Sequence, residues 1–233
     1  MEQPATAFDH HDRTEFQLER LILFTDAVFA IAITLLAIEI KIPEFEGRPT
    51  DAQVWERILW LIPKFIGFLV GFAVIAIYWT AHHRIFRFVR GYDQKLLWLN
   101  ILFLLCIVLM PFSSGLFSSY PTVKAPFTIY SLNIILTALA QVCVTRYLLN
   151  PAHHLIHPAA ATHPDLDWWR SLVPALGFAV ALVVIQFIPS NNGLRNLTPF
   201  LFLLTIPFSR MYQRRYRRLQ AQHAARQAAI EAQ

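Results

Sequence analysis

A charged pair near the N-terminus has the greatest potential for chemistry in this sequence. Arg20 and Asp26 both lie within or at the edge of a long apolar stretch. On a helix they are separated by about 9 Å of rise and point about 120° apart, so they do not pair locally. An ionised carboxylate in apolar surroundings is costly unless it is paired or hydrogen-bonded. The partners of Asp26 are therefore expected on other segments.

Two later segments offer such partners, which are Trp79, His82, His83 and Asn100. Indole and imidazole N–H groups donate to carboxylates, and an asparagine amide can bridge a donor and an acceptor. Two interpretations are open. The residues either fix helix packing or contact a moving ion or proton, and we favour packing.

A second feature of the same stretch is the apolar stripe formed by Ile31, Leu35 and Ile38, with Thr34 beside it. Spacing of i, i+4 and i+7 is typical of ordinary helix packing, which spacing alone favours. If copies of the helix surround a symmetry axis, however, the stripe becomes rings of branched side chains that gate by dewetting. Thr34 would then add a ring of hydroxyls. Glu39 would form a carboxylate ring at the outer mouth that attracts cations.

Other chemistry is not indicated. The sequence contains no Walker, GxSxG, HExxH or CxxC motif and no Thr-Val-Gly-Tyr-Gly filter. His153, His154 and His157 lie between prolines and are not expected to form a metal site. Cys106 and Cys143 are expected to pack as small apolar side chains. We expect no catalytic residues, no metal and no enzyme activity.

Composition identifies the elements that position these residues. The chain has 233 residues, 56% of them hydrophobic and only 15% charged, with a mean hydropathy of +0.44. Uncharged runs cover residues 96–120, 125–145 and 171–194. Because about 20 helical residues cross a bilayer, the sequence predicts an all-α polytopic membrane protein. The first 19 residues are polar, so no cleavable signal peptide is expected.

Six transmembrane helices are predicted, at residues 20–42, 58–83, 96–117, 125–148, 171–188 and 196–209. The sixth is short and crosses only if Arg195 and Arg210 lie at opposite interfaces. The predicted organisation is a cytoplasmic segment (1–19), a six-helix channel domain (20–210) and a basic cytoplasmic tail (211–233).

Charge distribution predicts the orientation. With six spans, 14 Lys and Arg residues fall on the side of the termini and 6 on the other side. The positive-inside rule therefore places both termini in the cytoplasm of a cell (inner) membrane. Because the basic residues cluster at span ends and in the tail, they do not indicate nucleic-acid binding.

Two motifs carry a family resemblance. The first is Arg20-x-x-x-Phe24-Thr25-Asp26, followed by Ala30-Ile31-x-x-Thr34-Leu35-Leu36. The second is Trp79-x-x-His82-His83-Arg84-x-Phe86, followed by Asp93 and Asn100. Over residues 20–117 the chain resembles the transmembrane protein 175 family of lysosomal and prokaryotic potassium-permeable channels. Thr25 stands where the family signature has Ser, which keeps the hydroxyl.

The resemblance implies a homotetramer of six-helix units whose pore is lined by the first helix. It implies a hydrophobic constriction at Ile31, with Leu35 and Ile38 further out, and a potassium preference set by Thr34. It also implies a packing network formed by the signature residues Arg20, Phe24, Thr25, Asp26, Trp79, His82 and Asn100. The implied function is a weakly selective cation channel that needs no cofactor, with lipid and permeant monovalent cations such as K⁺ as partners.

Two other functions remain open from the residues. One is a proton-coupled transporter that uses Asp26 and His82 as a relay. The other is a membrane enzyme or scaffold that uses the histidine-rich loop at 153–163. Neither predicts a central symmetry axis with ohmic current.

Overall fold

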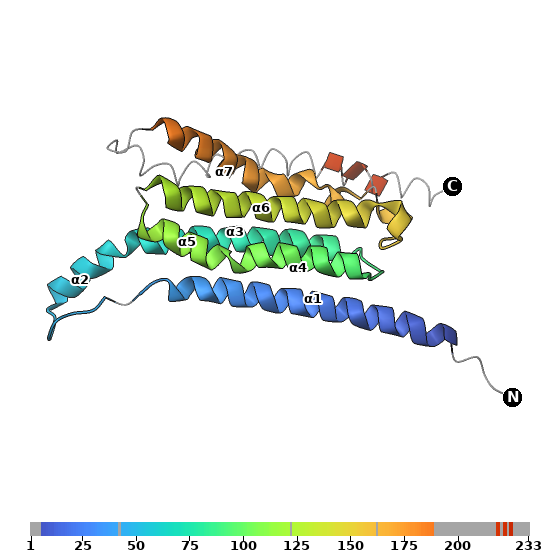
Figure 1. Cartoon of the computed structure of the whole chain (residues 1–233), viewed down its shortest axis with the longest axis horizontal. Helices are drawn as coiled ribbons and strands as arrows, with labels where there is room; N and C mark the ends of the chain where they lie inside the picture. Colours follow the sequence, from blue (N-terminus) through green and yellow to red (C-terminus); the bar gives the residue numbers. More distant parts are fainter. Residues whose placement is uncertain are drawn as a thin grey trace.

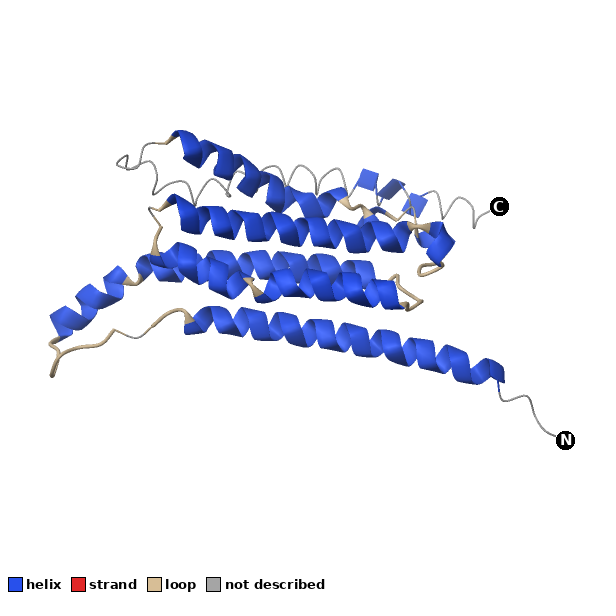
Figure 2. Cartoon of the chain, viewed as in Figure 1, coloured by secondary structure: helices blue, strands red, loops and turns tan. Residues whose placement is uncertain are grey.

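The computed structural model describes residues 6–188 except 42, 122 and 162, together with 218, 219, 221, 222, 224 and 225. Within these residues every secondary-structure element is a helix, and the helices are joined mostly by short loops (Figure 2). The α-helices are α1 (Thr6–Ile38), α2 (Asp51–Trp60), α3 (Ile62–Phe86), α4 (Gln94–Val108), α5 (Met110–Ser119), α6 (Lys124–Leu149) and α7 (Trp169–Phe187).

Five stretches of the described chain are long and apolar enough to cross a membrane: Glu15–Ile38, Ile62–Phe86, Gln94–Ser119, Lys124–Leu149 and Trp169–Phe187. They match the first five predicted spans, so the all-α polytopic class is confirmed. The predicted sixth span at 196–209 and most of the predicted tail at 211–233 lie outside the described residues.

Prolines mark two differences from the predicted spans. The second predicted span begins inside α2, but the helix is interrupted at Leu61, just before Pro63 in α3. The third predicted span is divided into α4 and α5 at Leu109, just before Pro111. Proline has no N–H to donate and clashes with the preceding turn, which bends or breaks a helix. α2 is a separate helix that begins at a capping box of Thr50 and Gln53.

The helices pack in layers, with α1 on one side and α7 on the other (Figure 1). α1 contacts α3, α4 and α5, which form the next layer. α6 lies between this layer and α7. Large buried side chains such as Phe29, Ile75, Phe103 and Ile134 fill the space between layers. α1 is therefore held by one face only.

A close approach between α3 and α5 depends on Gly67. A Cβ at this position would lie 2.4 Å from the Cβ of Ser118. We expect Gly67→Ala to lower the stability of the purified protein by about 1–3 kcal/mol, because the two helices would be forced apart. Thermal unfolding in detergent measures the effect. Ser118→Gly in the same chain should restore part of the loss, and an unchanged melting temperature of Gly67→Ala alone would contradict this close contact.

Candidate functional site

A buried chain of hydrogen bonds joins α1, α3 and α4. His82 Nε2 lies 2.8 Å from Asn100 Oδ1, and Asn100 Nδ2 donates to Thr25 Oγ1 at 2.8 Å. Thr25 Oγ1 in turn donates to the Leu21 carbonyl at 2.8 Å. Because the threonine proton is used on the carbonyl, its oxygen accepts from the amide, which leaves Asn100 Oδ1 to accept from His82 Nε2–H. Each group therefore donates to the next in the same direction, from His82 of α3 through Asn100 of α4 to Thr25 of α1.

The imidazole of His82 is also held by aromatic rings. It stacks on Phe86 at 3.9 Å and on Phe103 at 5.3 Å between ring centroids. His82, Asn100 and Thr25 are each no more than 3% exposed. A polar group so deeply buried is tolerated because it is hydrogen-bonded.

Asp26 has a partner on α3, as the sequence requires. Trp79 Nε1 donates to Asp26 Oδ1 at 2.9 Å. The same indole stacks on His83 at 5.5 Å. The structure thus brings together five of the seven signature residues, in two adjacent sets that link α1 to α3 and α4.

The other two signature residues lie apart from these contacts. Phe24 is 54% exposed, and the guanidinium of Arg20 lies 5.7 Å from the ring of Phe16 on its own helix. Both side chains are therefore left on the outside of this single chain.

The apolar stripe of α1 is also uncovered. Ile31 is 57% exposed, Leu35 39% and Ile38 70%. On the opposite face Phe29, Ala32 and Leu36 are almost completely buried. The stripe is thus not the face that packs on the rest of the chain.

Thr34 lies on the same uncovered face, and its hydroxyl donates to the carbonyl of Ile31 at 2.8 Å. The hydroxyl proton is therefore directed at the helix backbone. The lone pairs of Oγ1 stay available to accept a donor or to contact a cation.

Glu39 takes a different direction from the stripe. Its carboxylate lies over Gly115 of α5, so close that a Cβ on Gly115 would be 2.5 Å from Glu39 Oε2. The same side chain lines a small cavity with Lys64 and Ser118. In the single chain Glu39 thus packs on its own subunit, beside the uncovered face.

No cluster of three or more His, Cys, Asp or Glu side chains suited to a metal occurs among the described residues. In the histidine-rich loop, His153 stacks on Tyr147 at 4.0 Å and its Nδ1 lies 2.9 Å from the Tyr147 carbonyl. Sequence reasoning missed a buried carboxylate in this loop, Asp165. Nothing in the sequence distinguishes it from Asp167.

The direction of the hydrogen bonds makes Thr25 testable. We expect Thr25→Val to lower stability by about 1 kcal/mol, because the Asn100 amide loses its acceptor inside a helix bundle. Thr25→Ser keeps the hydroxyl and should leave stability nearly unchanged. Thermal unfolding of the two purified variants compares them, and equal losses would contradict a role for the hydroxyl.

The fold and these contacts define a polytopic α-helical membrane protein. Its first span packs on the rest of the chain with one face and is uncovered on the other. The family model described as "Endosomal/lysosomal potassium channel TMEM175" matches residues 20–111, which include every residue of the hydrogen-bonded network. The chain belongs to the TMEM175 family.

Relatives in bacteria extend this match. A protein of Streptomyces collinus named a potassium channel is 32% identical over 58% of this chain and 66% of its own length. One of Chryseobacterium sp., also named a potassium channel, is 28% identical over 74% of this chain and 94% of its own length. A solved structure from Chamaesiphon minutus, titled a lysosomal potassium-selective channel TMEM175 homolog, has 26% identity and a TM-score of 0.66. It covers 83% of this chain and 96% of that one.

Proposed function

We propose that this chain is a potassium-permeable, weakly selective cation channel that assembles as a homotetramer around α1. It would work in a cell membrane with both termini cytoplasmic and without a cofactor. The observation that carries the proposal is the uncovered face of α1, on which the stripe and Thr34 lie opposite a fully packed face. The names of its bacterial relatives support potassium as the permeant ion.

Lipid is the other surface that such an apolar face could meet. Small side chains on the face favour a second helix, because they let membrane helices approach closely. Ala27 and Ala30 are such residues, and both are exposed in the single chain. Four copies of α1 around an axis would use them as contacts and direct the stripe inward.

The stripe would then control conduction. Rings of Ile31, Leu35 and Ile38 would exclude water when narrow, and a dry constriction blocks a hydrated ion without any charged gate. The rings must widen or rotate for ions to pass, so the closed state is the resting one. Thr34 oxygen atoms between these rings would offer the cation replacement ligands for lost water.

The proton-coupled transporter is disfavoured by the contacts of its proposed relay. Asp26 is bonded to Trp79, whereas His82 is bonded to Asn100. The two groups share no hydrogen bond among the described contacts, so a proton would need another route between them.

Flux from proteoliposomes tests the proposal. Purified protein is reconstituted under a potassium gradient, with the voltage set by an ionophore. The channel predicts ohmic, non-saturating potassium flux, together with a cross-linked tetramer in detergent. Saturating flux driven by a pH gradient would instead support a transporter, and a monomer or dimer without flux would support a scaffold or an enzyme.

A further inference from the structure

The link between α6 and α7, which contains the histidine-rich loop, is folded against the end of α3. We call residues 150–168 the inner loop, because the proposed orientation places them on the cytoplasmic side; of these, residue 162 is not described. It contains three short 3₁₀ turns, Pro151–His153, Pro158–Ala160 and Pro164–Leu166. The Leu155 carbonyl accepts from the backbone N–H groups of Arg90 at 2.8 Å and Gly91 at 3.2 Å. These bonds fix the inner loop to the turn that follows α3.

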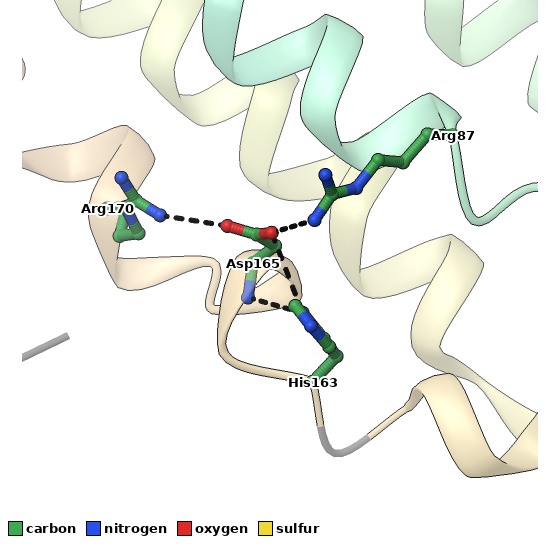
Figure 3. Close-up of polar contacts among 4 residues, drawn as sticks. All are labelled: Arg87, His163, Asp165 and Arg170. Carbon is green, nitrogen blue, oxygen red and sulfur yellow. Dashed lines mark hydrogen bonds and ion pairs between the residues drawn. The ribbon is translucent and has the colours of Figure 1, made fainter. Parts of the chain in front are cut away.

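The inner loop carries a buried carboxylate that two helices share (Figure 3). Asp165 is 6% exposed and forms ion pairs with Arg87, the C-cap residue of α3, and with Arg170, in the first turn of α7. The Arg170 Nη1 to Asp165 Oδ1 distance is 3.3 Å. His163 Nδ1 accepts from the Asp165 backbone N–H at 3.1 Å and lies 3.6 Å from the Asp165 carboxylate. Asp165 therefore connects the ends of two membrane spans.

Each partner approaches from a different element. Arg87 also lies over the Phe88 ring at 4.7 Å, and the His163 ring packs against the same ring in a tilted geometry, with 4.8 Å between ring centroids. Without the carboxylate, Arg87 and Arg170 would face each other as like charges. The cost falls mainly on Arg170, whose side chain is only 14% exposed and would lose its counter-ion, whereas Arg87 is half exposed and can turn to solvent.

α3 continues from this cluster to the helix with the uncovered face. Trp79, His83 and Arg87 follow one another at i, i+4 and i+8, so they share one side of α3 over about 12 Å. His83 stacks on Trp79, and Trp79 holds Asp26 of α1. One side of α3 thus runs from Arg87, at the Asp165 cluster, to the residue that holds Asp26 of α1.

We propose that Asp165 is a positioning residue of the channel, which fixes the inner end of α3 against α7 and thereby stabilises the resting position of α1. The inference rests on the proposed function. It assigns Asp165 an effect on how often the pore opens and none on the pore itself.

Single-channel recordings on reconstituted full-length protein test this. Asp165→Asn is expected to raise the open probability about three- to tenfold, the size of effect that such networks carry. The single-channel conductance and reversal potential should stay unchanged, because Asp165 lies away from the uncovered face of α1. A general structural defect would instead lower the yield of conducting protein without changing the open probability of each channel.

A set of arginine variants keeps the test decisive if Asp165→Asn does not fold. Arg87→Gln should raise the open probability as Asp165→Asn does, and Arg87→Lys should restore most of the resting behaviour. Arg90→Gln is the matched control. It removes the same charge from an exposed side chain three residues further along the chain, and it should leave the open probability unchanged. In the double variant the effects of Asp165→Asn and Arg87→Gln should not add, because each breaks the same contact.

The outcomes separate the two proposals. If the wild type conducts and Asp165→Asn or Arg87→Gln leaves the open probability unchanged, the positioning role is wrong and the channel stands. Equal effects of Arg87→Gln and Arg90→Gln would also overturn it, since they would reflect net charge alone. A wild type that carries no current overturns the proposed function, and the positioning role with it.

Discussion

Replacing Ile31 by asparagine is expected to raise potassium current about tenfold or more. An amide in each of four subunits would hydrate the narrowest ring, so the constriction would no longer dry out when closed. A tenfold rise corresponds to about 1.4 kcal/mol removed from the barrier, which is a modest amount for four amides in place of four butyl groups. The substitution should be tolerated, because Ile31 is 57% exposed in its own subunit.

Bilayer recordings of open probability and of current at fixed voltage measure the effect. Ile129→Asn on α6 is the matched control, since it makes the same change at a side chain that is 44% exposed and on a helix away from α1. It should leave the current unchanged. Ile31→Val, which keeps the ring apolar, should do the same. If Ile31→Asn conducts like the wild type, the gate is not at this ring.

Much of the fold follows from hydropathy, because a bilayer requires long uncharged helices. The helix at Lys124–Leu149 differs from the predicted span at 125–148 by one residue at each end. The start of the second span is predicted less accurately. Its predicted start fell in α2, whose apolar residues near Trp55 continue the hydropathy signal beyond the membrane helix. Only the local break at Leu61 separates the two.

The polar network was partly predictable from residue types. A carboxylate and an asparagine in apolar spans need partners, and indole and imidazole donors are few within the predicted spans. The specific pairs were not predictable, because the Thr25 to Asn100 contact joins residues 75 apart in the chain. The motif also grouped Arg20 and Phe24 with the network, whereas their side chains lie outside it in the single chain. A motif identifies residues that occur together, and that is not the same as residues that touch.

The inner loop was the least predictable part. Its prolines correctly indicate that no long helix forms, but they do not show that the chain folds back on the end of α3. The burial of Asp165 depends on Arg87, 78 residues earlier, and on Arg170. Glu39 is a similar case. Its position at a span end suggests the mouth of a pore, but the absence of a side chain at Gly115 creates the space that it fills.

Thr34→Ala is expected to lower the preference for potassium over sodium about two- to tenfold. The Thr34 proton is bonded to the Ile31 carbonyl, so the oxygen presents lone pairs on the uncovered face. A ring of four such oxygens would replace part of the water that a cation loses at the apolar rings. Potassium gives up water more easily than sodium, so weak oxygen ligands favour it. Losing a contact of about 0.5–1.5 kcal/mol accounts for the expected change.

Reversal potentials with potassium on one side and sodium on the other measure this preference directly. Thr34→Ser keeps the oxygen and is the matched control, which should retain the wild-type reversal potential. Thr34→Val keeps the shape without the hydroxyl and should behave like Thr34→Ala. If Thr34→Ala and Thr34→Ser both keep the wild-type reversal potential, the hydroxyl ring does not set selectivity. The apolar rings alone would then have to discriminate between the ions by the cost of dehydration.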